Sequence, residues 1–197
     1  MPNSDDFLMQ QFLSGDQGAF TILVNRYKLD IFRFILGKVK NREQASDLTQ
    51  EVFIKLFKAA KNYASRGKFK AWLYCLAQNL CIDEYRKRQK VSIFALHKAA
   101  NSATETNPRQ FDQLVDEANN PMQEVESFEL QETLNMALEL IPDNQKTALI
   151  LCQYQGMSYA EIAEIQNCPV GTVKSRIHNA LRKVKEILKE KGIIEGC

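Results

Sequence analysis

The sequence of 197 residues lacks several features that mark common classes of protein. No run approaches the roughly 18 apolar residues that a membrane span needs. The N-terminal segment, with Asp5 and Asp6, has no basic stretch leading into an apolar one, as a secretory signal would. We therefore expect a cytoplasmic protein without membrane insertion.

The sequence also has few candidates for chemistry. None of the five cysteines forms a CxxC pair, and neither His97 nor His178 lies at ligand spacing from a cysteine. An odd number of cysteines in a cytoplasmic chain favours free, mostly buried thiols, so we expect no metal and no cofactor. A glycine-rich phosphate loop and a His–Cys or His–Ser pairing are also missing, which argues against an enzyme.

Charge is unevenly distributed, although the net charge is only +2. Residues 66–90 and residues 169–191 each carry seven basic and two acidic side chains. Between them, residues 101–130 carry seven acidic side chains and one basic one. Two basic patches separated by an acidic segment favour a nucleic-acid partner.

Apolar periodicity predicts an all-α protein, because no segment shows a convincing strand alternation. Helices are expected over residues 7–15, 19–34, 41–62, 69–80, 128–141, 144–155, 158–165 and 169–189. Asn41 with Gln44 forms a capping-box pattern at the start of the third of these. We divide the chain into a domain over 1–92, a flexible acidic linker over 93–126 and a second domain over 127–197.

A helix-turn-helix is predicted near the C-terminus. Ser158 and Glu161 form a capping box, Asn167 and Cys168 make a turn, and Pro169 takes the first position of the next helix. At roughly 100° per residue, one side of that helix is apolar. The side consists of Val173, Ile177, Leu181, Val184 and Leu188.

The opposite side of the same helix suits a major groove. Short hydrogen-bonding side chains and one cation lie in its middle, where they can reach base edges, and further cations lie at its margins, where they can meet phosphates. The middle comprises Thr172, Ser175, Asn179 and Arg182, and the margins comprise Lys174, His178, Lys185, Arg176 and Lys183. An ordinary solvated basic face is the alternative.

Four segments together resemble the extracytoplasmic-function sigma factors of the sigma-70 class, the bacterial RNA polymerase initiation subunits. Residues 159–163 (YAEIA) and 169–176 (PVGTVKSR) are similar to region 4, whereas 47–57 (DLTQEVFIKLF) and 69–74 (FKAWLY) are similar to region 2. The sigma-E type is the most similar subgroup, chiefly through residues 168–173. The resemblance implies two small helical domains joined by a linker.

The resemblance also implies partners and sites. Residues of the helix from Asn41 would dock on the β′ clamp helices of core RNA polymerase: Asp47, Gln50, Glu51, Phe53, Lys55 and Leu56. Periodicity alone leaves residues 47, 51 and 55 as an exposed row, which could equally be a solvated face with a Glu51–Lys55 pair. The β flap of the polymerase is a further expected partner, and so is an anti-sigma factor.

For promoter DNA the resemblance implies two sets of contacts. Asn79 matches a position that helps to read the −10 element, and the loop 64–68 would form one wall of a pocket for a flipped base. The −10 set is Lys68, Asn79, Asp83, Arg86, Lys87, Arg88 and Lys90. The −35 set is Thr172, Lys174, Ser175, Arg176, His178, Asn179, Arg182 and Lys183. Trp72, with Leu73 and Leu76, is expected in the core, and stacking of Trp72 on a base is the alternative.

The expected function is promoter recognition and strand opening for a stress-type regulon. The rival hypothesis is a stand-alone helix-turn-helix activator with an N-terminal sensor or dimerisation domain. That hypothesis assigns no role to the basic patch over residues 66–90 or to the segment 47–57. The acidity of the linker is compatible with a solubilising role or with a segment that mimics nucleic acid inside the polymerase.

Overall fold

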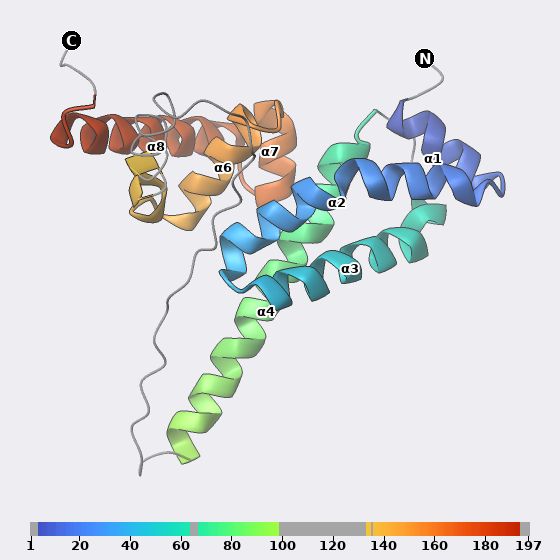
Figure 1. Ribbon diagram of the computed structural model, residues 1–197, viewed down its shortest axis with the longest axis horizontal. Helices are drawn as coiled ribbons and strands as arrows, with labels where there is room; N and C mark the ends of the chain where they lie inside the picture. Colours follow the sequence, from blue (N-terminus) through green and yellow to red (C-terminus); the bar gives the residue numbers. More distant parts are fainter. Residues whose placement is uncertain (1–3, 64–66, 99–132, 135, 194–197) are drawn as a thin grey trace, which may run out of the picture. The chain divides into compact units, whose positions relative to one another are not determined.

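The computed structural model describes residues 4–63, 67–98, 133–134 and 136–193. Every regular element within these ranges is helical, which confirms the all-α prediction (Figure 1). The chain forms two compact units, Met1–Asp112 and Gln113–Cys197. Their division falls inside the predicted linker, most of which lies outside the described residues, so the boundaries at 92 and 126 stay predictions. None of the described helices is both long and apolar enough to cross a membrane.

The described part of the first unit contains four α-helices and a short 3-10 turn. In chain order they are α1 (Asp5–Leu13), α2 (Gln17–Val39), α3 (Arg42–Ala59), η1 (Ala60–Asn62) and α4 (Phe69–Lys98). Each of the first three begins at a side-chain cap, in which Ser4, Asp16 or Asn41 accepts a hydrogen bond from a backbone N–H of the first turn. These caps explain why the helices begin where the sequence predicts, within about two residues.

The capping box predicted at the start of α3 is only half formed. Asn41 accepts from the Gln44 N–H at 2.8 Å. The Gln44 side chain does not return the bond to Asn41. Its amide nitrogen donates to Glu84 at 2.7 Å and its oxygen accepts from Arg88. A tertiary contact between α3 and α4 therefore replaces the local one.

α2, α3 and α4 enclose the core of the first unit, and α1 packs against α2. The largest fully buried side chains of this unit are Met9, Leu23, Ile31, Ile35, Val52, Leu56, Phe69, Leu73 and Tyr74. Trp72 and Leu76, expected in the core, are only half buried. Tyr74 fills the interior and forms an edge-to-face pair with Phe34 at 5.1 Å between ring centroids. Because Tyr74 lies outside the predicted apolar side of this helix and is nevertheless buried, α4 is buried over a wider part of its circumference than the sequence pattern predicts.

α4 is longer than the apolar pattern predicts. It continues to Lys98, past the expected end near residue 80 and past the predicted domain boundary, and its last turns extend beyond α2 and α3 (Figure 1). Apolar periodicity reports the buried side of a helix, so it stops where the packing stops. The helix itself continues because Arg, Lys and Gln are good helix formers and no proline or glycine interrupts them.

The second unit contains the predicted helix-turn-helix. Residues 133–134 and 136–139 are helical, and the rest of the helix predicted over 128–141 is either outside the described residues or a turn. α6 (Asp143–Gln153), α7 (Tyr159–Gln166) and α8 (Val170–Glu190) follow. α8 packs against both α6 and α7. Their shared core comprises Ala148, Leu151, Ile162, Val173, Ile177 and Ala180.

Candidate nucleic-acid interface

The turn between α7 and α8 has the expected construction with one change. The capping box is complete, because Ser158 accepts from the Glu161 N–H and the Glu161 carboxylate accepts from the Ser158 N–H at 2.8 Å. Asn167 ends α7 in the left-handed conformation with φ 47°. Pro169 is the N-cap residue rather than the first helical residue, because its ψ of 148° is extended and α8 begins at Val170.

The buried side of α8 is rotated from the predicted one. Val173 and Ile177 are buried as expected, but Leu181 is 46% exposed, and Ala180 and Ile187 are buried in its place. At roughly 100° per residue, Ala180 and Ile187 lie on one side of Val173 and Leu181 lies on the other. The sequence pattern placed Leu181 on the buried side because leucine is the larger apolar residue. In the structure α8 packs closely against α6 and α7, and the small Ala180 is buried instead.

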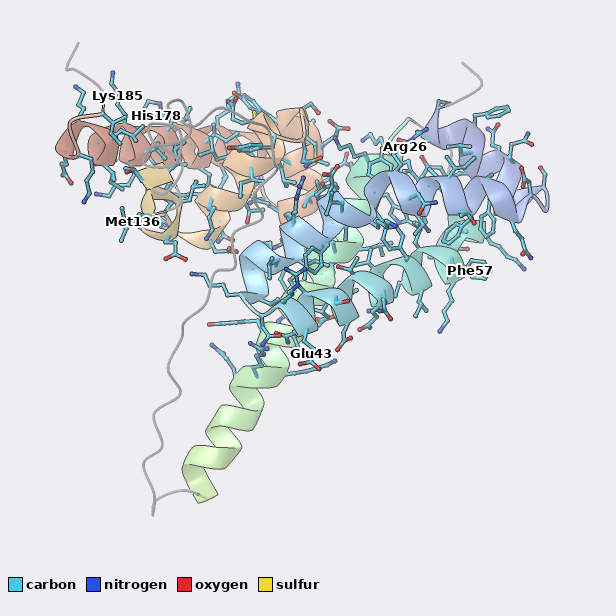
Figure 2. All side chains as sticks on the ribbon, viewed as in Figure 1. Arg26, Glu43, Phe57, Met136, His178 and Lys185 are labelled. Atoms are coloured by element: carbon cyan, nitrogen blue, oxygen red, sulfur yellow. The ribbon has the colours of Figure 1, made fainter. Side chains whose placement is uncertain are left out.

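This rotation changes the middle of the exposed side of α8. Ser175 and Arg182 now lie at its centre, and Lys174, His178 and Lys185 are also exposed. Figure 2 shows His178 and Lys185 projecting from the same side of α8, away from α6. Thr172 and Asn179, predicted in the middle, are half buried at one edge. Of the predicted −35 set, the structure therefore gathers mainly serine, histidine and cations on one exposed side.

Glu186 lies among these cations. Its two carboxylate oxygens are 3.9 Å from Arg182 Nε and 3.7 Å from Lys183 Nζ. All three side chains are about half exposed or more, so solvent screens both pairs and they add little stability. Arg182 and Lys183 can therefore exchange Glu186 for a phosphate or a base at small cost.

Arg176 has a different environment from the other cations of α8. Its Nη1 donates to Gln166 Oε1 at 2.7 Å and to Cys168 Sγ at 3.2 Å. Gln166 in turn donates to the Asn144 carbonyl at 2.8 Å. Arg176 thereby joins the end of α7, the turn and the start of α6. The structure places Arg176 beside the turn and not on the exposed side with Arg182.

On α4, three members of the predicted −10 set share one side. Asn79, Asp83 and Arg86 are exposed, and Arg86 Nη1 lies 3.8 Å from Asp83 Oδ1. Trp72 lies two turns before Asn79 on the same side. It is half buried and stacks on Tyr63 at 4.9 Å between ring centroids. Lys68, also exposed, immediately precedes the helix.

The remaining predicted −10 cations are not on this side. Arg88 pairs with Glu84 at 3.5 Å and donates to Gln44, which places it against the start of α3. Lys87 is exposed on a third side of the helix. The side chain of Lys90 is outside the described residues. α4 therefore presents one mixed polar and cationic side around Asn79, and Arg88 has a tertiary contact of its own.

The exposed row on α3 is present as predicted, but two members of the predicted docking set are not exposed. Asp47 and Gln50 are exposed, and Lys55 pairs with Glu51 at 3.5 Å. Phe53 is 8% exposed and Leu56 is fully buried. Both side chains pack in the core of the first unit, so they have little or no surface with which to contact a partner.

Two apolar residues that the sequence reasoning missed are exposed on α3. Ile54 and Phe57 expose 52% and 53% of their surface, and Figure 2 shows Phe57 near the end of the helix. Both follow Gln50, at four and seven positions, which places them on the same side as the polar row. That spacing was the available signal. Together they add apolar surface beside the charged row.

Comparison with known proteins agrees with this geometry. The Sigma-70 region 2 family matches residues 23–91 and the Sigma-70, region 4 family matches residues 131–184. The ECF RNA polymerase sigma factor SigW of Bacillus subtilis is 33% identical over 92% of this chain and 95% of its own length. The chain is an ECF RNA polymerase sigma factor.

Further relatives and a solved structure extend the comparison. The sigma-E factor of Escherichia coli K12 is 30% identical over 90% of both chains. The sigma factor RpoE of Bartonella quintana, solved in complex with the anti-sigma factor NepR, has a TM-score of 0.64 at 22% identity and covers 86% of this chain and 96% of its own. The latter likeness shows the shared fold.

Membership of this family confirms the expected function in outline. The sigma factor recognises promoters and acts in transcription initiation, and the hypothesis of a stand-alone activator is set aside. The region 2 match begins within α2 and continues through α3 and α4 up to residue 91, and the region 4 match spans α6, α7 and most of α8. Apart from Lys185 at the end of the α8 surface, the candidate surfaces on α3, α4 and α8 lie within matched segments.

Proposed function

We propose that this sigma factor contacts a promoter through two helix surfaces, α8 at the −35 element and α4 at the −10 element, while α3 docks on core RNA polymerase. The observation that carries the proposal is the exposed side of α8. It places the hydroxyl of Ser175 and the guanidinium of Arg182 between further cations, in a helix-turn-helix with a complete capping box.

The −35 contact would divide readout and affinity between different residues. Arg182 and Ser175, at the centre of the exposed side, are placed to reach base edges in the major groove. Lys174, His178 and Lys185 are placed to meet the phosphates on its walls. Arg176 would support this contact indirectly, by holding the turn against α8 through Gln166 and Cys168.

The −10 contact would be made by the side of α4 that carries Asn79. An asparagine amide both donates and accepts, so it can bond two atoms of one base edge. Arg86 and Lys68 would neutralise the neighbouring phosphates. Trp72 is held by its stack on Tyr63, which supports a role as a wall of the site rather than as a mobile base-stacking residue.

The polymerase contact would combine charge with apolar surface. Asp47 and Glu51 on α3 match the positions at which the family contacts the β′ clamp helices, and Ile54 and Phe57 add exposed apolar area beside them. Contact of the second unit with the β flap would connect both units to one enzyme. A tether between the two units then raises the effective concentration of the second promoter contact once the first has formed.

Regulation by an anti-sigma factor belongs to the same proposal. The structurally similar sigma factor of Bartonella quintana was solved with its anti-sigma factor bound. A partner of this kind acting on the present chain would keep it from the polymerase until a stress signal releases it. The proposal therefore extends to transcription of a stress-type regulon.

Single substitutions on the two helices test the promoter contacts. Arg182→Ala should lower initiation by about tenfold at promoters that depend on their −35 sequence, in line with the 1–3 kcal/mol expected of a base contact. Asn79→Ala should lower permanganate reactivity of the −10 region more than closed-complex binding. Lys28→Ala, which removes an exposed cation from α2, is the matched control and should change neither.

Two results would contradict the assignment. An equal loss from Arg182→Ala on every template, whatever its −35 sequence, would limit Arg182 to phosphate contact. An unchanged opening signal in Asn79→Ala would remove that residue from the −10 site.

A further inference from the structure

The carboxylate of Asp6 binds both ends of the segment that leads into α4. Asp6 lies in the first turn of α1, more than 50 residues before its partners. One of its oxygens accepts from the Tyr63 hydroxyl and the other accepts from the Gly67 N–H at 2.5 Å. Tyr63 follows η1 and Gly67 lies two residues before α4. The two oxygens of Asp6 therefore bind Tyr63 and Gly67, which are four residues apart in the chain.

Each end of this segment is also fixed by a second feature. Gly67 has φ +69°, a left-handed conformation that side-chain-bearing residues rarely adopt, and this sets the direction of its N–H. The Tyr63 ring stacks on Trp72 at 4.9 Å and meets Phe69 edge-on at 5.9 Å between ring centroids. Burial and the bond to Asp6 raise the pKa of Tyr63, so its hydroxyl remains a donor at any physiological pH.

These contacts lead from Asp6 to the side of α4 that carries Asn79. Asp6 holds Tyr63, Tyr63 stacks on Trp72, and Trp72 lies two helical turns before Asn79 on the same side of α4. Gly67 immediately precedes Lys68, a member of the same candidate site. Asp6, which lies on α1, thus holds both ends of the segment that leads into α4.

The neighbouring residue Asp5 has a separate task. Its carboxylate pairs with Arg26 and accepts from the Tyr27 hydroxyl at 2.5 Å, which anchors α1 to α2. Both aspartates lie in the first turn of α1, where each favours the helix through its dipole. The pair therefore separates anchoring of α1, by Asp5, from contact with the segment before α4, by Asp6.

We infer that Asp6 is a positioning residue for −10 recognition. By holding Tyr63 and Gly67 it sets the entry to α4, so that a base displaced from the −10 element meets Asn79 in one geometry. This inference rests on the proposed function, since it assumes that the side of α4 around Asn79 reads the −10 element. Asp6 itself need not touch DNA.

Asp6→Asn tests the inference with little change in size. The asparagine keeps one acceptor oxygen but presents an amide NH₂ in place of the other and carries no charge, so it cannot accept from both the Tyr63 hydroxyl and the Gly67 N–H, and the charged acceptor of both bonds is lost. With core polymerase, transcription is measured from promoters that carry each of the four bases at every −10 position. The preferred sequence should lose on the order of tenfold, the range of a hydrogen bond to a charged group, whereas disfavoured sequences lose less. Base discrimination at −10 then flattens, while discrimination at −35 is retained.

Matched variants distinguish positioning from simple stability. Asp5→Asn removes the same charge from the same helical turn and should lower thermal stability while leaving −10 discrimination unchanged. Tyr63→Phe keeps the stack on Trp72 but loses the bond to Asp6, and should flatten −10 discrimination in the same direction as Asp6→Asn.

The outcomes also separate this inference from the proposed function. If Asn79→Ala flattens −10 discrimination but Asp6→Asn lowers transcription equally on all promoters, or leaves it unchanged, Asp6 is not a positioning residue and the −10 site stands. If Asn79→Ala has no effect on discrimination, the proposed −10 site is wrong. The inference would also be overturned if Tyr63→Phe retained base discrimination at −10 while Asp5→Asn lost it. That result would mean that the placement of α1 as a whole, and not the bond from Asp6 to Tyr63, sets −10 discrimination.

Discussion

Arg176 and Arg182 carry the same guanidinium on the same helix, but their surroundings give them different tasks. Arg182 is exposed, and its carboxylate partner among the described residues is the half-exposed Glu186 at 3.9 Å. Arg176 donates to Gln166 and Cys168 within its own domain. At the scale of single residues, the contacts of a charged group therefore distinguish an exposed cation, which we propose contacts DNA, from a structural one, whereas the residue type does not.

Removal of Arg176 should destabilise the second unit. Arg176→Ala leaves Gln166 without a charged donor, and a hydrogen bond of this kind contributes about 1.5–3 kcal/mol. Hydrogen exchange of the α7 and α8 amides should accelerate accordingly in the full chain. Arg182→Ala is the control, because a surface substitution of this kind changes stability by less than about 0.5 kcal/mol. Equal protection in both variants would show that Arg176 does not brace the turn.

At the scale of elements, α3 shows how one helix divides its sides between a core and a partner. Leu56 is fully buried and Ile54, two positions earlier, is 52% exposed. A helix of 18 residues with an apolar side toward α2 and α4 can still present isolated apolar residues beside its exposed charges. These isolated residues, and not the buried ones, are available to core polymerase.

Two alanine substitutions on α3 should separate the two sides. Leu56→Ala should lower the free energy of unfolding by about 2–5 kcal/mol, because it leaves a cavity in the core. Ile54→Ala should leave stability nearly unchanged and weaken binding to core polymerase. Chemical denaturation and a polymerase pull-down of the full chain measure the two effects. A pull-down unaffected by Ile54→Ala would exclude that residue from the docking surface.

At the scale of the whole molecule, the first unit contains three tyrosines with raised pKa values. Burial is the largest cause for Tyr27, Tyr63 and Tyr74, with hydrogen bonds to Asp5 and Asp6 as the next cause for the first two. The Tyr74 hydroxyl is buried and has no hydrogen-bond partner within the described part of the chain.

The first unit should therefore lose stability at alkaline pH. A pKa raised in the folded state means that folding favours the neutral phenol. Its contribution is fully present below the unfolded value of 10.0 and is lost as the pH rises above it. Denaturant midpoints and tyrosinate absorbance of the full chain would show the loss. Tyr74→Phe removes one of the three phenols and should therefore reduce the loss of stability at alkaline pH. An unchanged pH dependence in this variant would show that Tyr74 does not contribute to that loss.

The two promoter contacts should act independently, because Asn79 and Arg182 belong to different compact units. Combining Asn79→Ala with Arg182→Ala should add their effects on promoter binding free energy to within about 0.3–0.5 kcal/mol. Promoter affinities of the two single variants and the double variant, at one salt concentration, measure the coupling. A larger coupling energy would show that one contact sets the geometry of the other.

Local sequence determined the helices, the caps at Asn41 and Ser158, the helix-turn-helix and the family. These features depend on neighbouring residues, through hydrogen bonds within one turn and through apolar periodicity. Periodicity could also place residues on opposite sides of α8. It could not choose between Ala180 and Leu181 for the buried side, because that choice depends on how closely α6 and α7 approach.

Tertiary structure decided the features that join distant residues. Arg176 became a structural residue because Gln166 lies within reach of its guanidinium. Phe53 and Leu56 entered the core because α2 and α4 cover that side of α3. Asp6 reached Tyr63 and Gly67, about 60 residues away, only because α1 packs near the start of α4. Such contacts leave no periodic signal in the chain, since their partners are brought together by the packing of whole helices.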